Sequence, residues 1–148
     1  MALIGTGRQA YAQVRSIASQ RSLREVRVYS RTPEHRDAFC EDVRLLIPNL
    51  NIFAVDSAEQ AVRGADLVIA ATTSKTPVVK GEWLSPGTHV TTLGPKGTTI
   101  RELDQEVVAR ADLIVSDSPE QERDNPQGSL LEGTGKTLHD LADMVQGR

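Results

Sequence analysis

Short apolar segments alternate with segments of helical character along most of the chain, and this alternation constrains the fold more than any other feature. The strand-like segments are 2–4, 25–29, 51–55, 67–71, 89–93 and 113–115. The helix-like segments, judged from apolar spacing or from start signals, are 8–21, 33–46, 57–63 and 102–110. Strands that alternate with helices form parallel sheets with right-handed crossovers. The sequence therefore predicts an α/β fold with a doubly wound, mostly parallel sheet, organised as a single domain over 1–148.

The last part of the chain is patterned less regularly. Residues 124–137 are rich in Asn, Pro, Gln, Gly and Ser, which predicts a loop. Residues 137–146 are predicted to form a closing amphipathic helix.

The first strand and helix are joined by a glycine-rich turn with the sequence Gly5-Thr6-Gly7-Arg8-Gln9-Ala10, which fits G-x-G-x-x-A. Gly5 would allow a tight turn, Gly7 would let the backbone approach a diphosphate, and Ala10 would let the helix pack closely on the strand. The helix N-terminus would then present free N–H groups to the anion. In this position the pattern predicts a dinucleotide-binding Rossmann domain. The alternative is a glycine-rich turn with a purely structural role.

The residues after the second strand bear on the choice of cofactor. In NAD-binding versions of this fold an acidic residue stands there, about 20 residues after the last glycine, and accepts hydrogen bonds from the adenosine ribose. This chain has Ser30, Arg31 and Thr32 instead. A guanidinium between two hydroxyls would bind the 2′-phosphate of NADP, which a carboxylate would repel, so we predict NADP(H), with NAD(H) less favoured. The alternative is that Arg31 is solvated and Thr32 only caps the helix; Arg36, one turn further on, could assist or be exposed.

Charge and composition agree with a small anionic ligand and exclude other classes. Residues 1–44 carry eight arginines and five acidic residues, whereas 45–148 carry nine basic and fifteen acidic residues. Aromatic residues make up 3% of the chain, so a nucleic-acid partner is not expected. The longest apolar run, 67–71, is far shorter than the ~20 residues of a membrane helix, so no membrane is expected either. With one cysteine and no signal sequence, we expect a cytoplasmic protein.

No self-contained catalytic set is evident in the sequence. His35, His89 and His139 are dispersed, and no Cys or His pair has the spacing of metal ligands, so neither a catalytic residue nor a metal site is predicted. Cys40 falls in a predicted helix with no adjacent His and is expected to be a small buried apolar side chain.

Several runs of sequence resemble the ornithine cyclodeaminase/mu-crystallin family over nearly the whole chain. They are 5–10, 29–32, 70–74, 82–90, 93–96, 101–103 and 111–117. The resemblance implies that Thr72, Thr73 and Ser74 line the cofactor cleft after the fourth strand. It also implies that Leu93 and Gly94 approach the nicotinamide after the fifth strand. The alternative is that these are ordinary turn residues at strand ends.

The resemblance also implies a branch of the family and an incomplete enzyme. True cyclodeaminases would have acids where this chain has Ser30 and Ser74, which favours the branch similar to mu-crystallin and the imine reductases. The family places a substrate and dimerisation domain ahead of the glycine turn. We therefore expect the NADP(H)-binding domain of an imine reductase or amino-acid dehydrogenase-like protein, not catalytic in isolation, with a homodimer or the missing domain as partner. One alternative is a stand-alone NADP(H)-binding or interaction module; another is a shikimate dehydrogenase or glutamyl-tRNA reductase domain, against which 82–93 counts.

Overall fold

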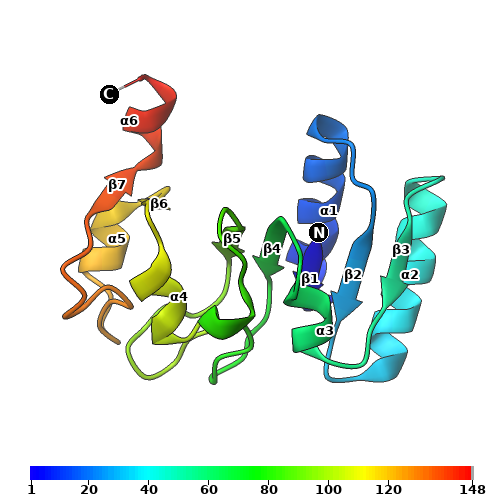
Figure 1. Cartoon of the computed structure of the whole chain (residues 1–148), viewed down its shortest axis with the longest axis horizontal. Helices are drawn as coiled ribbons and strands as arrows, with labels where there is room; N and C mark the ends of the chain where they lie inside the picture. The colour runs from blue at the N-terminus through cyan, green and yellow to red at the C-terminus, as the bar shows by residue number, and fades with distance from the viewer. Residues whose placement is uncertain (148) are drawn as a thin grey trace. The chain divides into compact units, whose positions relative to one another are not determined.

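The computed structural model describes residues 1–147, and their contacts fall into two compact units. The first unit comprises 1–73 and 83–94, and the second comprises 74–82 and the chain from Pro95 onward. The organisation as one domain stays a prediction; Figure 1 labels the helices and strands of both units.

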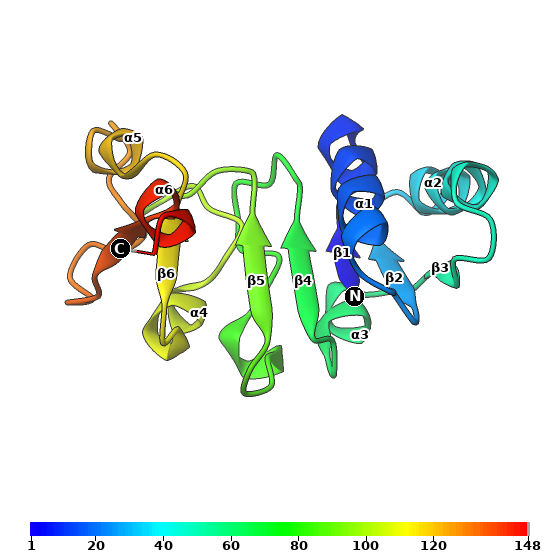
Figure 2. The same cartoon turned by 90° about the horizontal axis from the view of Figure 1, so that it is seen from above.

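The first unit is built on a parallel sheet of five strands. They are β1 (Ala2–Ile4), β2 (Val26–Tyr29), β3 (Ile52–Ala54), β4 (Leu67–Ala70) and β5 (His89–Thr92). Their order in the sheet is β3-β2-β1-β4-β5, so the chain builds outward from β1 in one direction and then crosses back to place β4 on the other side of β1. The predicted doubly wound parallel sheet is thereby confirmed, and its order reverses between β1 and β4 (Figure 2).

Three helices of the first unit follow the first three strands. They are α1 (Arg8–Gln20), α2 (Pro33–Leu46) and α3 (Ala58–Val62). One apolar cluster joins α1 and α2 to a single face of the sheet and contains Leu3, Ala10, Val14, Val26, Val28, Phe39, Cys40, Val43, Ile52 and Ile69. Because side chains alternate along a strand, Ala2 and Ile4 point to the opposite face, where α3 contacts β1 and β2. Removing the Phe39 ring from this core would cost about 3–5 kcal/mol.

Cys40 and Tyr11 belong to the packing between α1 and α2. Cys40 is buried, as expected from the sequence, and burial raises the pKa of its thiol to about 11. The Tyr11 ring packs against Phe39, with 4.4 Å between ring centroids, and its hydroxyl donates a hydrogen bond of 2.7 Å to Asp42. Burial and this hydrogen bond raise the pKa of Tyr11 to about 12. The two helices are therefore joined by both apolar and polar contacts.

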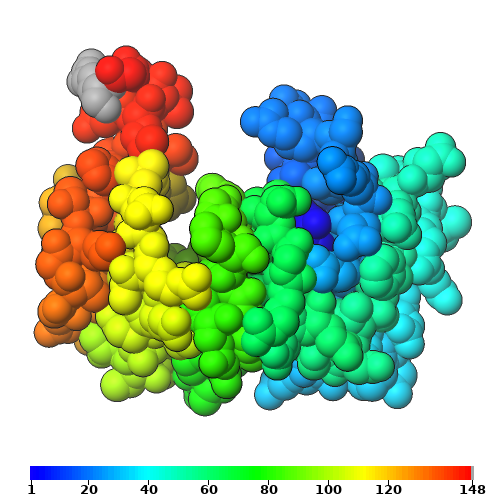
Figure 3. Space-filling model, viewed as in Figure 1, coloured from blue at the N-terminus to red at the C-terminus, as the bar shows by residue number. Residues whose placement is uncertain are grey.

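The second unit has a small parallel sheet of its own. Its elements are α4 (Gln105–Arg110), β6 (Ile114–Ser116), α5 (Pro119–Arg123), β7 (Leu138–Asp140) and α6 (Leu141–Val145), and the short helix η1 (Gly81–Trp83) spans the boundary between the units. The sequence placed β6 in the same parallel sheet as the other strands, whereas it pairs with β7 in a separate two-stranded sheet. Figure 3 shows α6 (red) projecting from the rest of its unit, and Leu141, Met144 and Val145 on it are exposed.

Two helices of the second unit begin later in the chain than predicted. The helix expected over 137–146 begins only at Leu141, because Leu138–Asp140 pairs with β6 and Asp140 then caps the helix by accepting a hydrogen bond from the Ala142 amide. The helix expected from residue 102 begins at Gln105, because the Asp104 carboxylate accepts from the Val107 amide and fixes the start there. Helix α5 was not predicted at all. None of the helices within residues 1–147 has the length and apolarity to cross a bilayer.

Candidate cofactor site

The strands of the first unit all end at one edge of the sheet, which we call the carboxyl edge. Three backbone hydrogen bonds extend the ladders to this edge: the Gly5 amide donates to Tyr29, Ala71 to Ile4, and Leu93 to Ala70, at 2.8–2.9 Å. The residues that follow β1, β2, β4 and β5 are therefore neighbours. Ligands of open α/β sheets bind outside this edge, where the strand order reverses, which here is between β1 and β4.

Gly5 and Gly7 shape the turn between β1 and α1 for different reasons. Gly5 has a φ of +105°, and a Cβ there would lie 2.3 Å from the Ala71 carbonyl oxygen, so the turn admits only glycine. A Cβ on Gly7 would meet nothing within 4 Å. The packing of residues 1–147 therefore does not require glycine at position 7. Because Gly7 has no side chain, the outer surface of the turn is open. Ala10 is fully buried, in line with close packing of α1 on β1.

The first two amides of α1 have no hydrogen-bond acceptor among residues 1–147. Gly7 is its N-cap residue and offers no side chain, and the first turn holds no acidic residue. The amides of Arg8 and Gln9 donate to no atom of residues 1–147. Arg8 also adds a positive charge where the helix dipole is already positive. Unsatisfied donors and a cation at one helix end form a site that favours an anion.

Ser30, Arg31 and Thr32 follow β2 at the carboxyl edge and leave their side chains available. Arg31 is exposed and makes no ion pair with residues 1–147. The Thr32 backbone begins α2, but its hydroxyl makes no capping hydrogen bond, and Pro33 occupies the first helical position. The Thr32 side chain therefore does not act as the cap of α2.

Arg36 is engaged in a way that the sequence did not indicate. Its side chain is only 12% exposed, and Nη2 lies 2.6 Å from Oδ1 of Asp56 in an ion pair. Sequence reasoning left Arg36 as a helper or an exposed residue, and it missed Asp56 altogether. The available signal was an acidic residue directly after the third strand of a predicted parallel sheet.

The residues expected after β4 and β5 are divided between the units. The Thr72 methyl group would lie 3.1 Å from a Cβ on Gly5, so Thr72 adjoins the glycine turn. Thr73 is exposed, and Leu93, at the end of β5, is 37% exposed although apolar; Gly94 follows it. Ser74 belongs to the second unit, where its hydroxyl donates to the Thr76 carbonyl at 2.8 Å. The structure therefore brings Thr72 and Leu93 to the carboxyl edge of the first unit.

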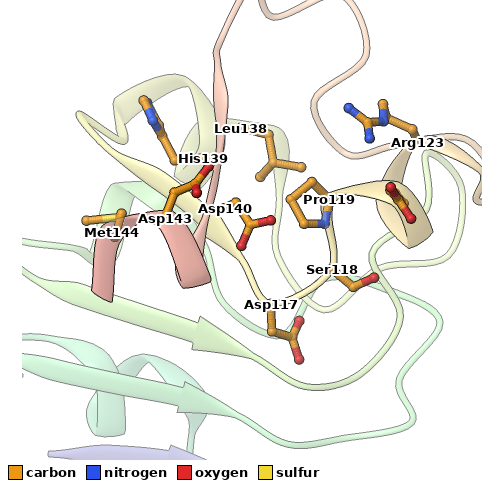
Figure 4. Close-up of a pocket in the computed structure, with 10 residues that line it drawn as sticks. Asp117, Ser118, Pro119, Arg123, Leu138, His139, Asp140, Asp143 and Met144 are labelled. Carbon is orange, nitrogen blue, oxygen red and sulfur yellow. The ribbon is translucent and has the colours of Figure 1, made fainter. Parts of the chain in front are cut away.

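A separate hollow of about 610 Å³ lies in the second unit and has a different character (Figure 4). Its lining comes from the ends of β6 and β7 and from α5 and α6, and its charged members are Asp117, Glu120, Arg123, Asp140 and Asp143. Four carboxylates against one guanidinium disfavour an anionic dinucleotide. Within residues 1–147, no group of three His, Cys, Asp or Glu side chains is placed to hold a metal ion.

The fold and the turn together define a class of protein. An open parallel sheet that reverses order beside β1, with a glycine turn leading into an uncapped helix, is the Rossmann class of α/β domain. The model of the ornithine cyclodeaminase/mu-crystallin family matches residues 1–148. The chain belongs to this family, which confirms the resemblance seen in the sequence and sets aside the alternative of a shikimate dehydrogenase or glutamyl-tRNA reductase domain.

Individual relatives agree with this assignment. Ketimine reductase mu-crystallin of Rattus norvegicus is 33% identical over 147 residues, covering 99% of this chain and 45% of the rat protein. The structure of Thermococcus litoralis Δ1-pyrroline-2-carboxylate reductase with NADH and L-proline matches with a TM-score of 0.83 and 30% identity, over 99% of this chain and 46% of that one. An archaeal alanine dehydrogenase dimer with bound NAD matches with a TM-score of 0.69 and 32% identity, over 81% and 36%. The chain thus spans less than half the length of these relatives.

Proposed function

We propose that this chain is the NADP(H)-binding part of an imine reductase or amino-acid dehydrogenase-like enzyme. The observation that carries the proposal is the open N-terminus of α1, which lies beside the reversal of strand order and whose first two amides have no acceptor among residues 1–147. Relatives that reduce ketimines, or that were solved with NADH or NAD, support a nicotinamide dinucleotide as the ligand.

The glycine turn would hold the diphosphate. The free amides of Arg8 and Gln9 would donate to its oxygens, and the space beside Gly7 would let the phosphates approach the backbone. The Arg8 side chain, exposed at the same helix end, would add a charge-assisted contact. Thr6, between the two glycines, would lie against the same group.

The residues after β2 would recognise the adenosine end. Arg31 would pair with the 2′-phosphate, and the hydroxyls of Ser30 and Thr32 would donate to it. The solved relatives described above contain NADH and NAD, so the preference for NADP(H) rests on these three residues of this chain. In NAD-binding domains a carboxylate at the end of β2 binds the unphosphorylated ribose, and Ser30 to Thr32 of this chain include no carboxylate.

The residues after β4 and β5 would hold the nicotinamide end. Thr72 and Thr73 of the first unit would line one side, and Leu93 with Gly94 would present an apolar surface to the ring. The bound nicotinamide would supply or accept the hydride, while these residues orient it and exclude water. Groups that bind an imine or keto acid would come from protein beyond these 148 residues, so the chain alone is expected to bind cofactor without turning over substrate.

Calorimetric titration of NADPH and NADH tests the proposal. The wild-type chain should bind NADPH roughly tenfold or more tightly than NADH, because hydrogen bonds to charged groups contribute about 1.5–3 kcal/mol. Arg31→Ala should remove most of that preference and leave NADH affinity unchanged. Arg24→Ala is the matched control, since Arg24 is exposed just before β2, at the opposite edge of the sheet. Equal affinity for both cofactors in the wild type would refute the preference for NADP(H).

A further inference from the structure

Asp56 lies beside the end of β2 although it follows β3, the next strand along the sheet. Val28 on β2 is in register with Ala54 on β3, and the Val55 amide continues the ladder by donating to Val28 at 2.9 Å. Ser30 and Asp56 each follow two residues later on their own strands. A carboxylate therefore stands at the carboxyl edge next to Ser30, one strand away from the place where an NAD-binding sheet has its acid.

The position of Asp56 is fixed from two directions. Its amide donates to Oε1 of Gln60 at 3.0 Å, which ties the backbone after β3 to α3. Its Oδ1 meets Nη2 of Arg36 at 2.6 Å. The Arg36 amide in turn donates to the Thr32 carbonyl, so the cation extends from the first turn of α2 that follows Arg31.

The two members of this pair differ in exposure. The Arg36 side chain is 12% exposed and packed in place, whereas the Asp56 side chain is 86% exposed. Without Arg36, an unpaired carboxylate would face solvent beside the proposed 2′-phosphate position. Without Asp56, a second uncompensated guanidinium would lie one helical turn from Arg31.

We infer that the Arg36–Asp56 ion pair is a specificity-determining element that sets how strongly the site distinguishes a 2′-phosphate from a 2′-hydroxyl. Arg36 neutralises the carboxylate that would otherwise repel the phosphate, and Asp56 neutralises the guanidinium that would otherwise strengthen its binding. The inference rests on the proposed function, because it concerns the adenosine end of the same cofactor site. Arg36 acts here through Asp56 and is a positioning residue.

The two single variants are expected to shift binding in opposite directions. Asp56→Asn should tighten NADPH about two- to fivefold, and Arg36→Gln should weaken it by a similar factor, as befits charges near the surface. NADH affinity should stay within about twofold in both variants, since it has no phosphate at this position. Both shifts should shrink in 0.5 M salt, where charges are screened over about 4 Å.

The control is a second ion pair of the same kind elsewhere in the unit. Glu59 and Arg63 on and after α3 are also joined at 2.6 Å, and both side chains are about half exposed. Glu59→Gln and Arg63→Gln should leave the ratio of NADPH to NADH affinity unchanged. Because Arg36 is largely buried, thermal unfolding of each variant is recorded alongside; exposed Asp56 gives a variant expected to fold even if Arg36→Gln does not.

The outcomes separate this inference from the proposal on which it rests. Opposite shifts of NADPH affinity with NADH unchanged support it. Equal changes for NADPH and NADH, or no change with Asp56→Asn, overturn it and reduce the pair to a structural contact. If the wild type binds both cofactors equally but Asp56→Asn still favours NADPH, the role of Arg31 fails while the inference stands. If no dinucleotide binds, the proposed function fails and the inference with it.

Discussion

The starts of α1 and α3 each follow a strand of the same parallel sheet but are completed in different ways. At α3 the Ser57 hydroxyl accepts from the Gln60 amide at 3.1 Å, and the Gln60 side chain accepts from Asp56. At α1 the cap residue is Gly7, and no side chain within residues 1–147 accepts from the first turn. Every helix start has donors that need partners. At α3 the protein's own side chains accept from these donors. At α1 no side chain within residues 1–147 does so, and there we propose that a diphosphate binds.

This difference has a cost for stability. A Ser, Thr, Asp or Asn cap contributes typically about 1 kcal/mol over Ala, and Gly falls only a few tenths short of it. An open start with a cation in the first turn is therefore slightly less stable than a closed one.

Gly5→Ala tests the turn that positions the open helix. A side chain there meets the Ala71 carbonyl and forces a φ of +105°, so the free energy of unfolding should fall by at least about 2 kcal/mol. Urea denaturation followed by circular dichroism measures this. Gly87→Ala provides the comparison, since Gly87 also has a positive φ but open space around it. A loss for Gly5→Ala no larger than for Gly87→Ala would mean that the close approach to Ala71 does not matter.

Gly7→Asp closes the open helix with a cap of its own. Asp is a good N-cap and its charge favours the helix dipole, so stability should rise by a few tenths of a kcal/mol. NADPH affinity should nevertheless drop at least about tenfold, because the carboxylate would fill the proposed diphosphate position and repel the diphosphate. Thermal unfolding and calorimetry on the same preparation give both values. Undiminished affinity would place the diphosphate away from this turn.

Ser57→Ala opens the closed helix. Losing the hydroxyl that accepts from Gln60 should cost about 1 kcal/mol of unfolding free energy. NADPH affinity should remain within about twofold, because the start of α3 has no part in the proposed diphosphate site. A large loss of affinity would remove the distinction between the two helix starts.

Tyr11→Phe alters the packing of α1 on α2 and leaves the amide donors of both helix starts unchanged. Losing the hydrogen bond to Asp42 should cost about 0.5–1.5 kcal/mol at neutral pH. The folded pKa of Tyr11, about 12, is above the ordinary value of 10, so this contribution is fully present below pH 10 and is lost as the pH rises through 12. The stability difference from wild type, measured by urea denaturation, should therefore shrink above pH 10. A constant difference up to pH 12 would contradict the assigned pKa.

The sequence predicted the first unit well because its signals are local. The turn 5–10, the strand 67–71 and the helix from Pro33 each lie within one short run of residues. The prediction failed where distant partners decide the structure. Leu138–Asp140 becomes a strand through pairing with β6, more than 20 residues away, although the amphipathic pattern of 137–146 predicted a helix.

The candidate site shows the same limit. Gly5, Ala10 and Arg31 could be singled out because a spacing pattern relates them to a ligand. Asp56 could not, because its place beside Ser30 follows from the register of β2 and β3, and its pairing with Arg36 follows from the packing of α2. Such contacts appear only once the fold is known.

The amide NMR spectrum during titration with NADPH tests the contrast between the two helix starts most directly. We predict large saturable shifts for the amides of Arg8 and Gln9, with a further shift at Arg31, and clearly smaller shifts for the amides of Ser57 and Gln60, which adjoin only Asp56 at the adenosine end. Shifts confined to the acidic hollow around Asp117 and Asp140, or equal shifts at both helix starts, would contradict the assignment of the open α1 terminus as the diphosphate site.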